Sequence, residues 1–330
     1  NIEWTKPDGT KVEGNPLLIP NAGVSDAGMY EVNAESKDGC STPPTSYVVV
    51  NIFAPEKKNY KICSGDSQVL ISSGIAPYTW SPTSETLNLQ TITVSPTQNT
   101  IYKSSNHKLG QNILVNTDFK KGNTEFVSDY VYAGTIVATT PSISGKYSTI
   151  YSARAFSSEF NNVYVHDLNT NKGVHLIAKC TAISGKKIWS KMVEVSPNTQ
   201  YKFSAWFVGA QRSGTAAKLR FSINDQLSGD QIVPNAPEIV SKKESWKQYS
   251  TLWNSGNRTT ATLSIVSDVG ITDGAGVCID NITFSPYMEV TDTMQVLVSQ
   301  TPSPQISGDT VVCGGRAFLD AGSFINGAPY

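Results

Sequence analysis

The stretch YVVVNIF, Tyr47–Phe53, is short, rich in β-branched residues and followed at once by Ala54-Pro55. Runs of the same kind recur along the chain, with Gly, Pro, Asn and Asp between them: Val69–Ser72, Thr91–Ser95, Lys218–Ile223 and Thr260–Val266. Such runs are typical of strands, and no window keeps an apolar 3.6-residue period beyond about two turns. The sequence therefore predicts an all-β protein with few, short helices.

Length and composition indicate several domains and argue against some partners. The chain has 330 residues, which predicts two to four compact units of roughly 100–150 residues. With a net charge of -1 and no Lys/Arg run, we expect no nucleic acid or anionic membrane as partner. No apolar stretch approaches the ~18 residues that span a bilayer, so we expect no membrane insertion and an export signal upstream of Asn1.

Motifs of common enzymes and metal fingers do not occur in the sequence. There is no Gly-x-Ser-x-Gly, no His-Glu-x-x-His, no phosphate-binding Gly-x-x-x-x-Gly-Lys-Ser/Thr and no Cys-x-x-Cys. Two of the three histidines, His166 and His175, could share a metal but lack an evident third ligand. Loop acids that could serve a glycosidase are more typical of solvated turns: Asp225, Asp230, Glu238 and Glu244. We therefore expect a protein that is not an enzyme.

Two parts of the chain resemble immunoglobulin-like sandwiches. Asp26-Ala-Gly-x-Tyr30 resembles the tyrosine corner of that fold. YKICSGDSQVLISSGIAPYTWSP, residues 60–82, is similar to the immunoglobulin-like and polycystic-kidney-disease-like tandem modules of Bacteroidota surface proteins. MEVTDTMQVLVSQ, residues 288–300, fits the last strand of this second module, and INGAPY at the chain end repeats the IAPY before Trp80.

These patterns suggest an interrupted module, because domain termini often lie close together and tolerate insertions. We predict tandem immunoglobulin-like β-sandwiches with an inserted β jelly roll. The boundaries are 1–54 for the end of a first module, 55–110 plus 287–300 for the second, 111–286 for the insert and 301–330 for the start of a third.

Residues 111–286 resemble carbohydrate-binding modules of families 4, 9 and 22, jelly rolls with galactose-binding-like topology. The resemblance rests on ordered motifs such as NILVNTDFKKGNTEFVSDYVY, KIWSKMVEVSPNTQYKFSAWF and GVCIDNITF. It implies a surface on which aromatic rings stack against sugars. The candidates lie in the first half, where the family has its cleft rim, and ordinary packing is an equal alternative for them: Tyr130, Tyr132, Tyr151, Tyr164 and His166. Other aromatic residues are expected mainly in the core: Trp189, Phe203, Trp206, Phe221, Trp246 and Trp253.

The same resemblance implies a structural Ca²⁺ between the first and last strands of the insert. Its ligands would be Asp118 and Asp280, with Asn116 and Asn281, although Lys120 stands where the family usually has an acid; the alternative is Asp residues that cap turns.

The cysteines pose a separate question. The chain has five, an odd number for a protein that we expect to be extracellular. Cys180 and Cys278 lie in segments that the jelly roll would bring together, so they could form a disulfide or remain two buried thiols.

Two short patterns match the Asp-Thr/Ser-apolar signal that Bacteroidota use for O-glycosylation, at Thr293 and Thr310; ordinary strand threonines are the alternative. Together the resemblances predict a segment of a large extracellular cell-surface adhesin, similar to those exported by the type IX system of gliding Bacteroidota. The jelly roll would bind a polysaccharide or surface glycan, and neighbouring repeats of the same chain would form a stalk. The alternatives are a purely structural spacer and an accessory region of an exported polysaccharide-degrading enzyme.

Overall fold

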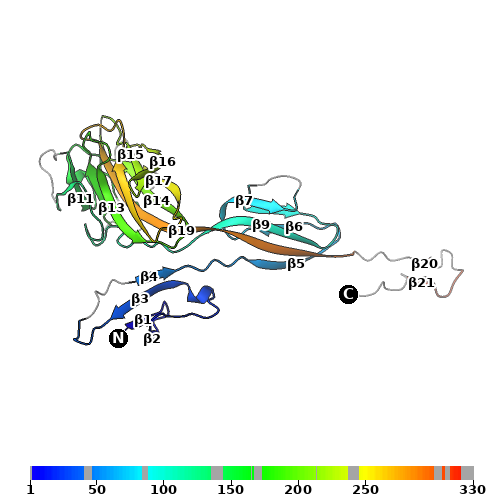
Figure 1. Ribbon diagram of the computed structural model, residues 1–330. Coiled ribbons are helices and arrows are strands. Elements are labelled where there is room, and N and C mark those ends of the chain that lie inside the picture. Colours follow the sequence, from blue (N-terminus) through cyan, green and yellow to red (C-terminus); the bar gives the residue numbers. More distant parts are fainter. Residues whose placement is uncertain are drawn as a thin grey trace. The chain divides into compact units, whose positions relative to one another are not determined.

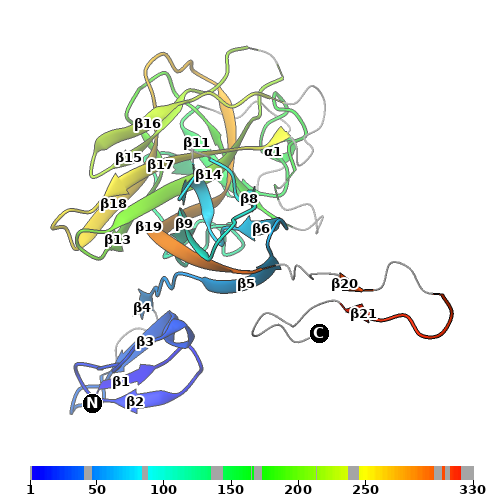
Figure 2. The same cartoon turned by 90° about the vertical axis from the view of Figure 1, so that its right-hand side faces the viewer.

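The computed structural model describes residues 2–40, 47–83, 88–134, 144–164, 166, 173–212, 214–236, 245–300, 307–308 and 313–320. These residues form mainly strands (Figure 1), and the described helices are short: α1 (Ala153–Phe156), labelled in Figure 2, and the 3-10 helix η1 (Val24–Asp26). The all-β prediction is confirmed. The chain divides into two compact units, Asn1–Phe53 with Leu109–Met288 and Ala54–Lys108 with Glu289–Tyr330.

The N-terminal residues form a four-stranded antiparallel sheet in the order β2-β1-β3-β4. Its strands are β1 (Ile2–Thr5), β2 (Lys11–Glu13), β3 (Gly28–Ala34) and β4 (Tyr47–Val50). The hydroxyl of buried Tyr30 donates a hydrogen bond of 2.9 Å to the carbonyl oxygen of Asp26. A tyrosine that bonds back to the backbone is the contact expected of a tyrosine corner, while the immunoglobulin-like identity of this sheet stays a prediction.

The second unit is built around strands far apart in sequence. Its strands are β5 (Lys57–Cys63), β6 (Gln68–Ile71), β7 (Ile75–Ser81), β8 (Thr91–Val94), β9 (Thr100–Leu109) and the end of β19 (Gly276–Ser299). β19 pairs in parallel with β5, from Thr293↔Lys57 to Ser299↔Cys63, and also pairs with β9. Met294 and Val296 of β19 therefore share a core with Leu70, Trp80 and Ile92. β20 (Ser307–Gly308) and β21 (Leu319–Asp320) form a further antiparallel pair. The four predicted domain boundaries stay a prediction.

The described residues between 111 and 286 form two sheets that pack as a sandwich (Figures 1 and 2). One sheet has the order β10-β11-β12-β19-β14-β17 and the other β13-β18-β15-β16. Besides β19, the first sheet consists of β10 (Val131–Tyr132), β11 (Lys146–Ile150), β12 (His175–Lys179), β14 (Gln200–Gly209) and β17 (Lys247–Asn254). The second sheet consists of β13 (Lys187–Glu194), β15 (Leu219–Ile223), β16 (Gln226–Ile232) and β18 (Thr260–Ser267). This two-sheet arrangement agrees with the predicted jelly roll.

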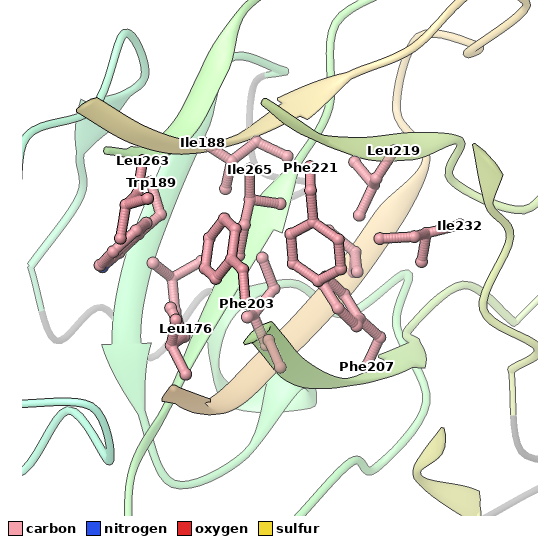
Figure 3. Packing of buried hydrophobic residues seen from close by; sticks show 14 of the residues in the cluster. Leu176, Ile188, Trp189, Phe203, Phe207, Leu219, Phe221, Ile232, Leu263 and Ile265 are labelled. Carbon is pink, nitrogen blue, oxygen red and sulfur yellow. The ribbon is translucent and has the colours of Figure 1, made fainter. Parts of the chain in front are cut away.

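Aromatic and branched side chains fill the space between the two sheets. Figure 3 shows Phe203 and Phe207 of β14 near Phe221 of β15, and the rings of Phe203 and Phe221 have centroids 4.5 Å apart. Trp189 also lies in this core. The predicted core positions of Trp189, Phe203 and Phe221 are confirmed.

These six strands, which we call the six-stranded sheet although β19 also pairs with strands of the second unit, carry buried side chains on both faces. We call the face toward the second sheet the inner face and the opposite one the outer face. Because side chains alternate along a strand, β12 sends Leu176 and Ala178 to the inner core and Ile177 to the outer cluster. The outer cluster includes Phe156 and Phe160, so α1 and the residues after it cover part of the outer face.

The predicted disulfide between Cys180 and Cys278 is wrong. Cys180 belongs to the inner core and Cys278 to the outer cluster, so the sheet separates the two sulfur atoms. Both are buried free thiols in the described part of the chain, as the alternative reading held. Burial raises the pKa of Cys180 to about 12 and also raises the pKa of Cys278.

Candidate functional site

The candidate site lies on the outer face, where β19, β14 and β17 run side by side. Trp206 of β14 pairs with Asp280 of β19 on one side and with Gln248 of β17 on the other. The register between β14 and β19 shifts between Ser204 and Trp206, and Asn281 has a φ of 47°. Bulges of this kind re-aim side chains, and Asn is among the residues that tolerate the left-handed region.

His166 is held at this bulge by contacts on several sides. Its imidazole stacks on Trp206, with ring centroids 4.0 Å apart and planes 27° apart, and meets Trp246 edge-on at 5.9 Å. Its backbone N–H donates to Oδ2 of Asp280 at 3.2 Å, and Nδ2 of Asn281 donates to its Nδ1 at 3.0 Å. We call these five residues the His166 cluster. The stacking and the hydrogen bonds together fix the orientation of the ring.

Exposed polar and aromatic groups surround the His166 cluster. The backbone oxygen of Tyr164 accepts a hydrogen bond of 3.2 Å from the Trp246 indole, and 41% of Tyr164 is exposed. The Tyr164 hydroxyl in turn accepts a bond of 2.6 Å from Nδ2 of Asn162. On β14 and β17, Nε2 of exposed Gln248 lies 3.3 Å from Oγ of Ser204. An aromatic ring of the protein can stack on the apolar face of a ligand ring. Amide and hydroxyl groups beside it can form hydrogen bonds with hydroxyl groups of the ligand.

The predicted sugar-contacting residues do not form one surface. Tyr151 and Tyr164 are exposed, at 50% and 41%, in the segment that covers part of the outer face. His166 lies in the cluster and is itself buried, with 8% of its surface exposed. Tyr132 is 37% exposed but pairs in register with Tyr147, whose ring belongs to the inner core and lies 5.2 Å away. Tyr132 therefore lies on the inner side of the sheet edge.

The structure contradicts the predicted sugar contact of Tyr130. It is a core residue, 5% exposed, and its burial raises the pKa of the phenol. The prediction that it contacts a ligand is wrong, because its side chain packs in the inner core although its neighbours Asp129 and Val131 are exposed.

The four predicted calcium ligands have other partners. Asn116 caps its own turn: Oδ1 accepts from the Lys121 N–H at 2.8 Å and Nδ2 donates to the carbonyl of Thr124 at 2.9 Å. Asp118 pairs with Lys120 at 2.6 Å, while Asp280 and Asn281 hold His166. Among the described residues no three His, Cys, Asp or Glu side chains gather as a metal site would require. The calcium site stays a prediction.

One residue of the glycosylation motif at Thr293 has a structural role. Asp292 is buried and accepts hydrogen bonds from the backbone N–H groups of Glu56 (2.8 Å) and Ser73 (2.9 Å) and from Nδ2 of Asn106 (2.8 Å). Thr293 is half-buried in β19 and pairs with Lys57. Thr310 lies outside the described residues, and glycosylation at both threonines stays a prediction.

Among the other titratable candidates His175 is unusual, because both of its ring nitrogens are buried without a hydrogen-bond partner in the described part of the chain. His175 is buried on β12, and desolvation lowers its pKa to about 3, so the ring is neutral at pH 7. It meets Trp246 edge-on at 5.7 Å. Asp225 is exposed and pairs with Lys187 at 2.8 Å, and Asp230 is exposed. Glu238 and Glu244 lie outside the described residues.

A pocket of about 400 Å³ at the β15–β16 hairpin has no counterpart in the sequence predictions. Its lining residues come from three segments: Ile223, Asn224, Gln226, Leu227, Ser228, Trp253 and Arg258. Trp253, expected in the core, is only half-buried and lines this pocket. Local patterns do not reveal a pocket that forms only when separate turns meet.

Compared with known proteins, the chain matches no family model and no curated protein. Among solved structures it is similar to a second carbohydrate-binding module of family 16, at 13% identity and a TM-score of 0.29, over 52% of this chain and 99% of that one. It is also similar to the family 22 xylan-binding domain of Paenibacillus barcinonensis Xyn10C, at 13% identity and a TM-score of 0.26, over 37% and 78%.

A Stig cyclase from Fischerella sp. TAU matches at 11% identity and a TM-score of 0.35, over 54% of this chain and 98% of the cyclase. Similarity at this level assigns neither a ligand nor an activity. Neither helix in the described part of the chain is long and apolar enough to cross a membrane.

Proposed function

We propose that the sandwich of residues 111–286 is a non-catalytic module that binds carbohydrate on its outer face. The observation that carries the proposal is the His166 cluster with its exposed rim. The buried ring of His166 stacks on half-buried Trp206, and the exposed ring of Tyr164 and the exposed Gln248 amide lie beside them. Sugar rings stack on flat apolar surfaces while their hydroxyl groups bond to amides, and this face offers both.

A binding role fits the carboxylate of the cluster better than a catalytic one. Asp280 is buried, and its two oxygens accept hydrogen bonds from the backbone of His166 (3.2 Å) and of Asn281 (2.8 Å). A general acid or base needs an oxygen within reach of substrate, whereas these bonds use the carboxylate to position the ring. The proposal therefore gives Asp280 a positioning role.

The test is a glycan array and polysaccharide affinity electrophoresis with the whole 330-residue chain. We expect binding to at least one polysaccharide, and Tyr164→Ala and Gln248→Ala should each weaken it by about tenfold, the loss of one good contact. Tyr132→Ala is the matched control, because Tyr132 is similarly exposed on the other side of the sheet. Absence of binding, or equal weakening by all three variants, would sink the proposal.

We extend the proposal to the whole protein: an extracellular adhesin in which the immunoglobulin-like repeats form a stalk. Its support is the resemblance of the repeat motifs to Bacteroidota surface modules. Antibodies against residues 1–330 should label intact cells of the source organism as strongly as permeabilised ones. Labelling only after permeabilisation would rule out a surface location.

A further inference from the structure

The pocket at the β15–β16 hairpin points to a second ligand. We propose that it binds a carboxylate-bearing sugar residue, such as a uronic acid. It is a separate site from the outer face, because Trp253 belongs to the inner-face row of β17 together with Tyr249. A volume of about 400 Å³ falls at the small end of ligand pockets and suits one sugar residue.

Trp253 forms a rigid wall of this pocket. Its ring packs against Tyr201, with centroids 6.1 Å apart, and against Phe284, also at 6.1 Å. These two core rings hold the indole from behind, while the side chain remains half-buried and reaches the pocket. A fixed indole provides the flat apolar surface on which a pyranose ring stacks with little loss of side-chain entropy.

Arg258 supplies the charge. It is exposed, and its turn is anchored: its N–H donates to the Ser255 carbonyl at 3.0 Å, and Oγ of Ser255 donates to the Ser196 carbonyl at 2.8 Å. Within the described segments no carboxylate forms an ion pair with Arg258. Among the described residues that line the pocket it is also the only charged one, so the pocket favours an anion. The guanidinium fork matches the geometry of a carboxylate.

Asn224 supplies a donor that the protein leaves without a partner. Its Oδ1 accepts from the Thr262 N–H and its own N–H donates to the Thr262 carbonyl, both at 2.8 Å, so the residue is pinned in its left-handed conformation. Its Nδ2 is buried and has no hydrogen-bond partner among the described residues. A buried donor of this kind is costly unless a ligand oxygen bonds to it.

The test is isothermal titration of the 330-residue chain with oligogalacturonate, its methyl ester and oligomannuronate. We expect at least one acidic oligosaccharide to bind, and the neutral ester to bind about tenfold more weakly than oligogalacturonate if that is the ligand. Arg258→Ala and Asn224→Asp should each weaken binding by about tenfold, the second because it removes the donor and adds a repelling charge. Arg212→Ala, an exposed arginine outside the pocket, should leave it unchanged.

The outcomes separate this pocket from the outer face. Tyr164→Ala should leave uronate binding intact, even if outer-face binding fails altogether. Failure of both acidic oligosaccharides to bind, an unchanged affinity in Arg258→Ala with an unchanged unfolding temperature, or loss of uronate binding in Tyr164→Ala would each overturn the proposal.

Discussion

The two faces of the six-stranded sheet are both buried, but they are built differently. The inner face meets a second sheet, and its core consists of apolar and aromatic side chains such as Phe203 and Phe221. The outer face is covered partly by α1 and irregular backbone, and it holds His166, His175 and Asp280 beside its apolar residues. Packing against a second sheet gives a uniform apolar core. Packing against irregular backbone brings polar groups into the interface, and burying these groups is costly unless they form hydrogen bonds. This contrast is why we propose the outer face, rather than the uniform core of the inner face, as the surface that binds neutral carbohydrate.

The largest expected effect is the loss of an inner-face ring. Phe203→Ala should lower the free energy of unfolding by about 3–5 kcal/mol, because two sheets cannot close over the cavity. Phe156→Ala, equally buried on the outer face, should cost about 1–3 kcal/mol, since its irregular cover can relax. Urea unfolding followed by tryptophan fluorescence measures both. Equal losses would show that the two faces are packed equally tightly.

The next largest effect is a loss of folding stability in acid, which we expect from His175 of the outer face. The pKa of His175 is about 3 in the folded state and about 6.5 when unfolded, so the unfolded chain binds the extra proton. The contribution of neutral His175 is fully present above pH 6.5 and is lost as the pH falls toward 3, by up to about 1.4 kcal/mol per pH unit.

His175→Leu should therefore flatten the stability profile between pH 6.5 and 4.5. Asp268 and Asp292 should not contribute in that window: burial raises their pKa values, but their hydrogen bonds outweigh it and hold them below 3.8. An unchanged slope in the variant would show that His175 is not the group that titrates.

A smaller effect tests how closely Phe160 packs against the outer face at Gly276. A Cβ at Gly276 would lie 2.6 Å from the Phe160 ring and 3.0 Å from Cβ of Ala210. Gly276→Ala should cost about 1–3 kcal/mol, and Phe160→Leu in the same chain should recover part of that loss. At Gly23 the nearest atom would be 3.9 Å away, so Gly23→Ala is the control and should change stability little. The absence of recovery by Phe160→Leu would show that this contact is not the source of the strain.

The smallest effect concerns the thiols on opposite faces. Because Cys180 and Cys278 are free and buried, a reductant should not change the unfolding temperature, and both should react with a thiol reagent only after unfolding. A fall in the unfolding temperature on reduction would show that the two cysteines form a disulfide after all.

Sequence patterns predicted the strands of the second sheet well and the contacts of the outer face poorly. The runs Lys218–Ile223 and Thr260–Val266 became β15 and β18 because a period of two directly reports a strand with one face in a core. The pairing of Trp206 with His166 depends instead on a bulge and on irregular backbone, which no local period encodes. The same holds for Asp292, whose partners Glu56 and Asn106 are remote in sequence.

The central claim is that ligand contact belongs to the outer face. Its most direct test is the NMR shift perturbation of the 330-residue chain by the neutral oligosaccharide that binds it most tightly on the array, since a neutral ligand should not favour the Arg258 pocket. We expect the His166 imidazole, the Trp206 indole and the Gln248 amide to shift most, while the Tyr132 signals stay in place. Shifts that centre on Tyr132, or that spare His166 and Trp206, would contradict it.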